Sequence, residues 1–377
     1  MARNRFELLL RMFHLANNEE CPFNDRLHKI QCLVDMLNRN ASLCIVPEET
    51  ICIDETMIPF RGRLSFRQYI KGKRHKFGMK IYKVCLDGGF TYSLKINCGK
   101  EKIEGQSVAE SIVMEMLQPL LDDGRTLYAD NWYISVALAE NLQKRSTDLV
   151  GTIQKNKKGL SKTVVDAKLK RGEIIARQNQ NKVVVMKWHD KRDVLLLSTK
   201  HTDEQKEVHH KEGPRLKPSA IIDYNTVKAF VDMSDMAAYS NSLRKSIKWY
   251  RKLACEFITG TSVVNALYLY NKINNKKTSI TTFKENLAMQ LFESGEPLHP
   301  NAENPVEEHR LTEKMDNEGK HKRGRCKSCY EKNSQQHGRD YAVKNTKRIT
   351  YICLSCNGNI FICTECFFEK HVFKKIK

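Results

Sequence analysis

Apolar and polar positions follow two different periods along this 377-residue chain. Near the N-terminus apolar residues recur at steps of three and four, in FELLLRMFHL and HKIQCLVDML, which predicts helices within residues 1–48. From residue 49 the period is that of short strands, in TICIDETM, KFGMKIYKVCL and FTYSLKINC, followed by a helical pattern and the apolar-led RTLYADNWY. Strands that precede and follow helices in this order predict an α/β layer, and we assign residues 49–154 to its first part.

Four further segments follow residue 154. Residues 155–215 contain the strand-like runs NKVVVMKW and DVLLLST among many lysines and arginines, which predicts a basic β-rich insertion. A helical pattern then starts near residue 227, and we assign residues 216–245 to the last part of the core and residues 246–296 to a helical segment. Residues 297–322 are polar and contain prolines, so they are predicted to be a linker to a cysteine-rich module, residues 323–377.

The charge of the chain indicates what it binds. Lys and Arg total 64 against 44 Asp and Glu, giving a net charge of +20 and a pI of about 9.3, which favours nucleic acid over an anionic membrane surface. A basic but ordinary soluble protein remains the alternative. Apolar runs such as VVNALYLY are far shorter than the roughly 20 residues that span a bilayer, and the first residues favour an amphipathic helix over a signal peptide. We therefore expect a protein inside the cell.

Four aspartates lie where they could share a metal ion. Asp54 and Asp130 each end an apolar strand pattern, while Asp232 and Asp235 are three residues apart on a predicted helix. Carboxylates of this kind bind Mg²⁺, and two such ions can stabilise both the attacking and the leaving oxygen of a phosphodiester displacement. The alternative is that these aspartates are caps or turn residues.

A basic strip follows Asp54. Residues 61–80 hold eight lysines or arginines and no acid, with Phe66, Tyr69 and Phe77 between them. Basic groups bind phosphates and aromatic rings can stack on unpaired bases, which suits a nucleic-acid groove, although a solvated basic hairpin would have the same composition. The candidate phosphate ligands are Arg61, Arg63, Arg67, Lys71, Lys73, Arg74 and Lys76.

Five longer motifs occur in a fixed order: IDETMIPFRGR, FRQYIKGKRHKFGMKIY, YADNWYIS, YNTVKAFVDMSDM and RKSIKWYRKLACEFI. In order and separation they resemble the piggyBac family of DDE transposases, over nearly the whole chain. The resemblance implies an RNase H-like catalytic core in which Asp54, Asp130 and Asp232 are the catalytic aspartates and Mg²⁺ ligands, with Asp235 as a fourth catalytic acid. It also implies flanking helices that bind DNA and pair protomers into a homodimer.

Family chemistry is Mg²⁺-dependent cleavage of double-stranded DNA at transposon ends and joining into TTAA targets, which implies a nuclear protein. Two departures leave an alternative open. Ala229 and Phe230 stand where the family commonly has small glycines, and Met1 falls inside the family's first DNA-binding domain. The chain could therefore be a domesticated or truncated transposase-derived DNA-binding protein that does not cut. A third hypothesis is an interaction protein whose core is only a scaffold for the cysteine-rich module.

Six cysteines near the C-terminus form three C-x-x-C pairs, a spacing that indicates zinc in a reducing compartment. With His371 these cysteines make seven possible ligands, one fewer than two tetrahedral zinc sites need, so His337 is a candidate eighth ligand. A single site made by the first two pairs is the simpler alternative. The resemblance implies a zinc module that helps recognise transposon-end DNA, although FFEKH replaces the family's F-x-x-Y-H. The predicted zinc ligands are Cys326, Cys329, Cys353, Cys356, Cys363, Cys366 and His371.

The remaining cysteines lie in apolar stretches, and we predict that those such as Cys32, Cys85 and Cys255 are small core residues rather than ligands. Trp249 and Tyr250, in SIKWYRK, are likewise predicted to anchor a core or an interface rather than to stack on bases.

Overall fold

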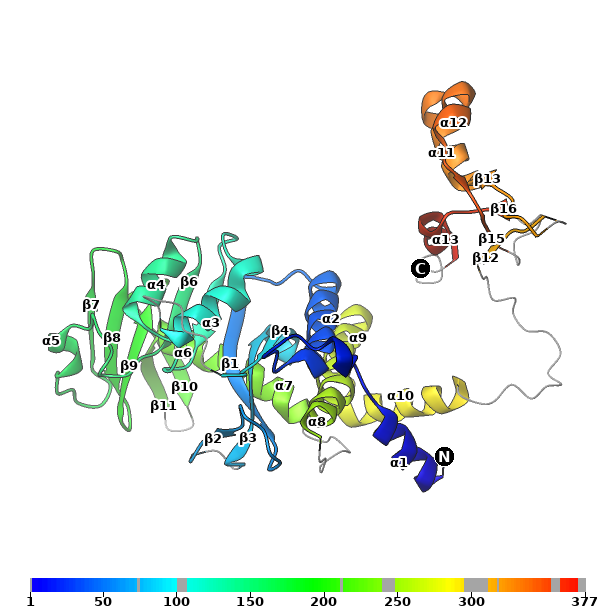
Figure 1. Ribbon diagram of the computed structural model, residues 1–377. Coiled ribbons are helices and arrows are strands. Elements are labelled where there is room, and N and C mark those ends of the chain that lie inside the picture. Colours follow the sequence, from blue (N-terminus) through cyan, green and yellow to red (C-terminus); the bar gives the residue numbers. More distant parts are fainter. Residues whose placement is uncertain are drawn as a thin grey trace. The chain divides into compact units, whose positions relative to one another are not determined.

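A computed structural model of the chain describes residues 2–72, 75–99, 107–210, 213–238, 248–294, 311–316, 319–353 and 360–371 (Figure 1). The chain forms two compact units, Met1–Gln290 and Leu291–Lys377. No helix within these described residues is long and apolar enough to cross a bilayer.

A nine-stranded sheet is the centre of the first unit, in the order β2-β3-β1-β5-β6-β9-β8-β7, with β4 also paired to β3. β1, β5 and β6 run parallel to one another, and the other pairings are antiparallel. The α/β prediction is therefore confirmed. The strands are β1 (Thr50–Pro59), β2 (Gln68–Tyr69), β3 (Phe77–Cys85), β4 (Thr91–Ile96), β5 (Thr126–Ala129), β6 (Asp148–Thr152), β7 (Ile174–Gln178), β8 (Val184–His189) and β9 (Asp193–Ser198).

Helices cover both faces of the sheet. α3 (Val108–Leu117) and α4 (Val136–Gln143) pack on the face that carries Ile51 and Ile53 of β1. α6 (Ser219–Val227) and α7 (Phe230–Ala238) pack on the opposite face, which carries Cys52. Because successive side chains of a strand point to opposite faces, both sides of the first half of β1 are buried, which explains its apolar run of residues 51–53.

A helical layer covers the β4 side of the sheet. α2 (His28–Cys44) packs on β4 together with α8 (Trp249–Glu256) in one core cluster. Tyr250 is buried there, and the partly buried Trp249 meets Phe66 edge to face at 5.2 Å, so both aromatics are core anchors as predicted. The other elements are α1 (Arg3–Met12), η1 (Asn18–Glu20), η2 (Asp87–Gly89), η3 (Gln118–Leu120), the π-helical turn η4 (Phe257–Thr261), α9 (Ser262–Asn274) and α10 (Ile280–Ser294).

The basic segment 155–215 extends the main sheet instead of forming a separate layer. Val150–Thr152 of β6 pair antiparallel with Leu196–Ser198 of β9, and β8 and β7 follow outward. α5 (Lys162–Val165) and the hairpin of β10 (Gln205–His210) and β11 (Gly213–Pro218) complete the segment. The predicted β-rich insertion is therefore continuous with the core.

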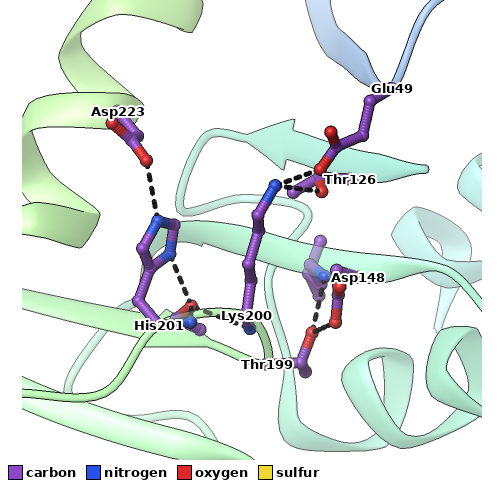
Figure 2. Close-up of polar contacts among 9 residues, drawn as sticks. Glu49, Thr126, Asp148, Thr199, Lys200, His201 and Asp223 are labelled. Carbon is purple, nitrogen blue, oxygen red and sulfur yellow. Dashed lines mark hydrogen bonds and ion pairs between the residues drawn. The ribbon is translucent and has the colours of Figure 1, made fainter. Parts of the chain in front are cut away.

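Polar side chains fasten the end of this insertion to the core (Figure 2). Thr199 Oγ1 donates to Asp148 Oδ1 at 2.6 Å, and Lys200 forms an ion pair with Glu49 beside Thr126. His201 lies between Ser198 Oγ (3.1 Å) and Asp223 Oδ2 (2.8 Å).

This Ser-His-Asp arrangement is structural. Ser198 is fully buried and its Oγ accepts the backbone N–H groups of Lys200 and His201, so a substrate has no access to the hydroxyl. Through Asp223 the network connects the insertion to α6, the helix that precedes α7.

The second unit consists of short elements around a small cluster of buried residues. Residues 311–313, which we assigned to the linker, form β12 and pair with β15, so the module's sheet begins earlier than the sequence pattern predicted. The elements are β12 (Leu311–Glu313), β13 (Gly324–Arg325), α11 (Lys327–His337), α12 (Arg339–Asn345), β14 (Arg348–Ile349), β15 (Tyr351–Cys353), β16 (Ile360–Phe361) and α13 (Thr364–His371).

The prediction for the remaining cysteines holds only in part. Cys52 and Cys85 are buried core residues and Cys255 is partly buried, but Cys32 is exposed. Cys32 lies on α2 away from its packed face, and its Sγ donates to the Leu15 carbonyl at 3.0 Å. An apolar stretch therefore does not by itself place every cysteine inside the core.

Candidate active site and cysteine site

The parallel pairing of β1 and β5 brings the first two aspartates to one edge of the sheet. Ile53 lies opposite Ala129 in this register, so Asp54 and Asp130 are the next residues on neighbouring strands. Asp130 is exposed, and its Oδ1 accepts a hydrogen bond from Thr152 Oγ1 on β6 at 3.3 Å. β5 ends just before Asp130, but β1 continues past Asp54 to Pro59, so Asp54 lies within its strand and not at its end as the pattern predicted. The two carboxylates stand side by side where the parallel pairing stops, Asp130 exposed and Asp54 partly buried.

The other two aspartates come from α7, on the face toward which Asp54 points. Thr56, two residues after Asp54 and on the same face of β1, donates to Asp235 Oδ1 at 2.8 Å. Asp232 lies one turn earlier on α7 and is exposed. Burial raises the pKa of the Cys52 thiol, and the charges of Asp54 and Asp232 add to this effect, which places both carboxylates near Cys52.

Asp54 lies in a strongly anionic environment. Burial, the adjacent Glu55 and, to a smaller extent, Asp130 raise the pKa of Asp54 to about 7. Its Oδ1 accepts the backbone N–H of Glu55 at 2.7 Å, and Glu55 in turn accepts from the Tyr133 hydroxyl at 3.4 Å. The arrangement therefore favours binding of a cation.

The chemistry of this donor set fits Mg²⁺. Carboxylate oxygens from two neighbouring strands and one helix are hard ligands, and Mg²⁺ usually keeps several waters beside one or two carboxylates. The carboxylates of Asp54, Asp130 and Asp232 are not all within 4.8 Å of one another, unlike the cysteine cluster described below. Asp54, Asp130 and Asp232 would hold the ion with water completing its shell.

Two lysines of β3, Lys80 and Lys83, lie beside the acidic residues, and the sequence analysis assigned neither of them a role. Glu55 forms an ion pair with Lys80 at 3.9 Å, and Lys83 Nζ is 2.8 Å from Asp235 Oδ1. In the β1–β3 register Lys80 lies diagonally across from Glu55, whereas Lys83 lies opposite Asp54 and reaches Asp235 on α7. The sequence around Lys80 and Lys83 indicated a strand but not the ion partners of either lysine.

The basic strip connects β1 to β3 along the chain and includes β2, at the edge of the sheet, and the start of β3. Arg67 donates to the carbonyls of Arg61 and Gly62, and its guanidinium lies over Phe77 at 5.1 Å. Tyr69 and Phe77 are exposed, with their rings tilted by 50° and their centroids 4.9 Å apart, whereas Phe66 is buried against Trp249. Only two of the three predicted base-stacking aromatics are therefore accessible.

Of the predicted phosphate ligands, those within the described residues are all exposed, while Lys73 and Arg74 lie outside those residues. The exposed set is Arg61, Arg63, Arg67, Lys71 and Lys76.

The second unit brings together four cysteines that fit a zinc ion. Sγ atoms of Cys329 and Cys363 are 3.7 Å apart, those of Cys329 and Cys366 are 3.4 Å apart, and those of Cys326 and Cys363 are 3.7 Å apart. A disulfide would need about 2.05 Å, whereas a tetrahedron with Zn–S bonds of about 2.3 Å has edges of about 3.8 Å. The backbone N–H of Cys363 also donates to Cys326 Sγ at 3.4 Å, a contact that favours a thiolate.

The first and third C-x-x-C pairs therefore form this site, not the first and second pairs of the simpler alternative. Among the residues that the structure describes, this is the one group of three or more Cys, His, Asp or Glu side chains close enough together to bind a single metal ion. Burial raises the pKa of the Cys329 thiol to about 11, so zinc would displace protons on binding.

Of the other predicted zinc ligands, only Cys353 and His337 have side chains that the structure describes, and neither belongs to the four-cysteine group. Cys353 is buried on β15, Cys356 lies outside the described residues, and the side chain of His371 is likewise not described. His337 ends α11 and packs its ring against Tyr341 at 4.6 Å. A second zinc site stays a prediction.

The chain is similar to known proteins over most of its length. A family model described as Transposase IS4 matches residues 1–267. The human PiggyBac transposable element-derived protein 3 is 25% identical over 98% of this chain and 63% of its own length. The human Chimeric ERCC6-PGBD3 protein is 25% identical over 98% of this chain and 35% of its own, and PiggyBac transposable element-derived protein 2 is 23% identical over 78% and 52%.

The chain thus spans less than two thirds of the length of these curated relatives. Among solved structures, a cryo-EM structure of the piggyBac transposase synaptic complex with hairpin DNA has a TM-score of 0.68 at 24% identity, covering 97% of this chain and 80% of that one. The family match extends over well over half of the chain and includes the motifs from Asp54 to Asp232. The chain belongs to the piggyBac family of DDE transposases.

Proposed function

We propose that this chain is a DNA transposase that cleaves and joins DNA strands at transposon ends with Mg²⁺, in an RNase H-like core. The observation that carries the proposal is the placement of Asp54 and Asp130 on neighbouring parallel strands, with Asp232 on the helix that covers Asp54. The strand order β4-β3-β1-β5-β6, two antiparallel strands beside three parallel ones, supports the RNase H-like assignment.

In this proposal the protein positions the reacting groups and supplies no nucleophile. Bound Mg²⁺ would stabilise the attacking and leaving oxygens of an in-line phosphodiester displacement. Asp54, Asp130 and Asp232 would hold and orient the ion, and the hydroxyl of Thr152 donates to the carboxylate of Asp130. Asp54 must lose its proton to act as a ligand, so its raised pKa in the metal-free protein makes Mg²⁺ binding strengthen as the pH rises through neutral.

The DNA-binding part of the proposal rests on exposed charge. The net charge of +20, the exposed basic strip and the accessible pair Tyr69 and Phe77 suit double-stranded DNA that is locally opened at a transposon end. By family resemblance we further propose TTAA targets, a homodimer, a nuclear location, and a zinc-bound C-terminal module that contributes to end recognition.

The test is cleavage of DNA that carries the genomic flanks of the coding region, in Mg²⁺ and in EDTA. The wild type is compared with Asp54→Asn and Asp232→Asn, and with Asp203→Asn, an exposed aspartate outside the site, as the control. Metal-dependent nicking that the first two substitutions abolish and the control retains is the expected result. Nicking that persists in EDTA, or in both site variants, would contradict the proposal.

A second candidate function is DNA binding without cleavage. It is favoured by two relatives whose names describe them as transposable element-derived, and by Phe230, a bulky residue buried at the start of α7. Tight binding that weakens steeply with salt, with no nicking in any condition, would support this candidate instead.

A further inference from the structure

Lys83 is a buried cation beside the candidate acids. It lies on β3 directly opposite Asp54 in the β1–β3 register, and only 2% of its surface is exposed. A buried ammonium group is costly unless it is paired and hydrogen-bonded, so its partners indicate its role.

Those partners are on α7 and fix one turn of that helix to the sheet. Lys83 Nζ is 2.8 Å from Asp235 Oδ1 and 3.5 Å from Ser234 Oγ. Thr56 Oγ1 on β1 donates to the same Asp235 oxygen at 2.8 Å. The hydroxyl of the fully buried Ser234 lies 2.9 Å from Thr91 Oγ1 on β4. Polar contacts therefore join α7 to three neighbouring strands, β1, β3 and β4.

The backbone fits equally closely at this point. Gly89 in η2 has a φ of +82°, and a Cβ added there would lie 2.8 Å from the backbone nitrogen of Ser234. α7 packs against η2, β1 and β3. Neither a shift nor a rotation of α7 is possible without breaking these contacts.

The position of α7 determines where Asp232 stands. Asp232 is three residues before Asp235, so the two share a face of the helix. Asp235 Oδ1 already accepts two hydrogen bonds, one of them from a buried ammonium group, which commits much of its charge to the protein. Asp235 therefore has the contacts of an anchor, while Asp232 is exposed at the edge shared with Asp54.

We propose that the buried Lys83 and the partly exposed Asp235 form an anchor that positions α7, and with it Asp232, against Asp54. Lys83 is then a positioning residue, and Asp235 acts through the placement of Asp232 rather than as a Mg²⁺ ligand. The effect of the anchor on the metal site rests on the proposed function. The anchor itself is a property of the fold and does not depend on that function.

The test compares Lys83→Met with Lys187→Met. Lys187 is also a buried lysine in an ion pair, 2.9 Å from Asp193 in the insertion. Lys187→Met therefore shows what removal of such an ion pair does away from α7. The measurements are hydrogen exchange of the α7 backbone amides and binding of Mn²⁺ to the full chain. We expect Lys83→Met to speed exchange in α7 and to weaken Mn²⁺ binding by about tenfold or more, and Lys187→Met to change neither.

Asp235→Asn separates an anchor from a ligand. If Asp235 is an anchor, Asp235→Asn and Lys83→Met cause the same defects, and the double variant is no worse than either one. Loss of Mn²⁺ binding in Asp235→Asn with α7 exchange unchanged would overturn the proposal, as would Lys83→Met behaving like Lys187→Met. If Lys83→Met does not fold, Thr56→Val removes the other donor to Asp235 and is expected to cause a smaller change in both measurements. A wild type that binds no Mn²⁺ would defeat the proposed function, while hydrogen exchange would still decide whether the anchor exists.

Discussion

Asp54 has surroundings that favour its protonated form. Its pKa is about 7 in the folded protein, against an ordinary value of 3.8, because it is buried and lies beside Glu55 and Asp130. Between these two values the folded state holds a proton that the unfolded chain has lost. The free energy of unfolding of the metal-free protein therefore decreases as the pH rises from about 4 to about 7.

We predict that Asp54→Asn stabilises the metal-free protein at high pH. The difference in the free energy of unfolding between variant and wild type should grow by about 3 kcal/mol from pH 5 to pH 8.5, since the variant has no charge to bury. Added Mg²⁺ should stabilise the wild type at pH 8.5 but not the variant. Thermal unfolding at both pH values measures this, with Asp203→Asn as the control, and a pH-independent difference would contradict it.

At the scale of elements, the fit of α7 against η2 depends on one glycine. Gly89→Ala should destabilise the protein by about 2 kcal/mol or more, because it adds a close contact with Ser234 to a left-handed backbone. Gly172 also has a positive φ, of +90°, but nothing lies within 4 Å of its added Cβ, so Gly172→Ala isolates the backbone strain of about 1–2 kcal/mol. Denaturant unfolding compares the two, and equal losses would mean that the contact with α7 is unimportant.

The segment around β2 is the element that we expect to contact phosphates. Lys71 and Lys76 are exposed there, so the double variant Lys71→Gln/Lys76→Gln should weaken DNA binding and lower the slope of log affinity against log salt by about two. Lys182 and Lys191 are exposed on turns beside β8, near the opposite end of the sheet from β2, and provide the matched control. Fluorescence anisotropy over a salt series measures the slope. An equal effect of both double variants would contradict a local phosphate contact, because it would mean that DNA binding depends only on the net charge of the protein.

At the scale of the whole molecule, the two units should depend on zinc differently. The second unit has a small core that includes Cys326, Cys353 and Cys366, so we expect it to unfold when zinc is removed. Met1–Gln290 has its own large core and should keep its thermal transition.

Cys326→Ser should lower the zinc content by one ion per chain and raise hydrogen exchange in residues 319–353, whereas Cys21→Ser, at an exposed cysteine, should change neither. Metal analysis and hydrogen exchange together measure this. Unchanged zinc content in Cys326→Ser would contradict the four-cysteine site.

Local sequence patterns were enough to predict most elements. The helices of residues 1–48, the strands that precede Asp130 and contain Asp54, and the α/β class follow from the period of apolar residues, although β1 continues past Asp54 to Pro59. This period shows which side of an element is buried, since it compares residues only with their close neighbours in sequence. The same patterns marked the acids, the basic strip and the paired cysteines, because these chemical groups stand close together along the chain.

Contacts between distant segments were decided only by the tertiary structure. Lys83 meets Asp235 across 152 positions, Cys326 meets Cys363 across 37, and β9 continues the main sheet beside β6. The burial of Phe66 and the exposure of Cys32 likewise depend on which helix covers each surface. A periodic pattern determines that a face is buried, but the partner of that face is selected by packing and charge over the whole fold, which no local window of sequence contains.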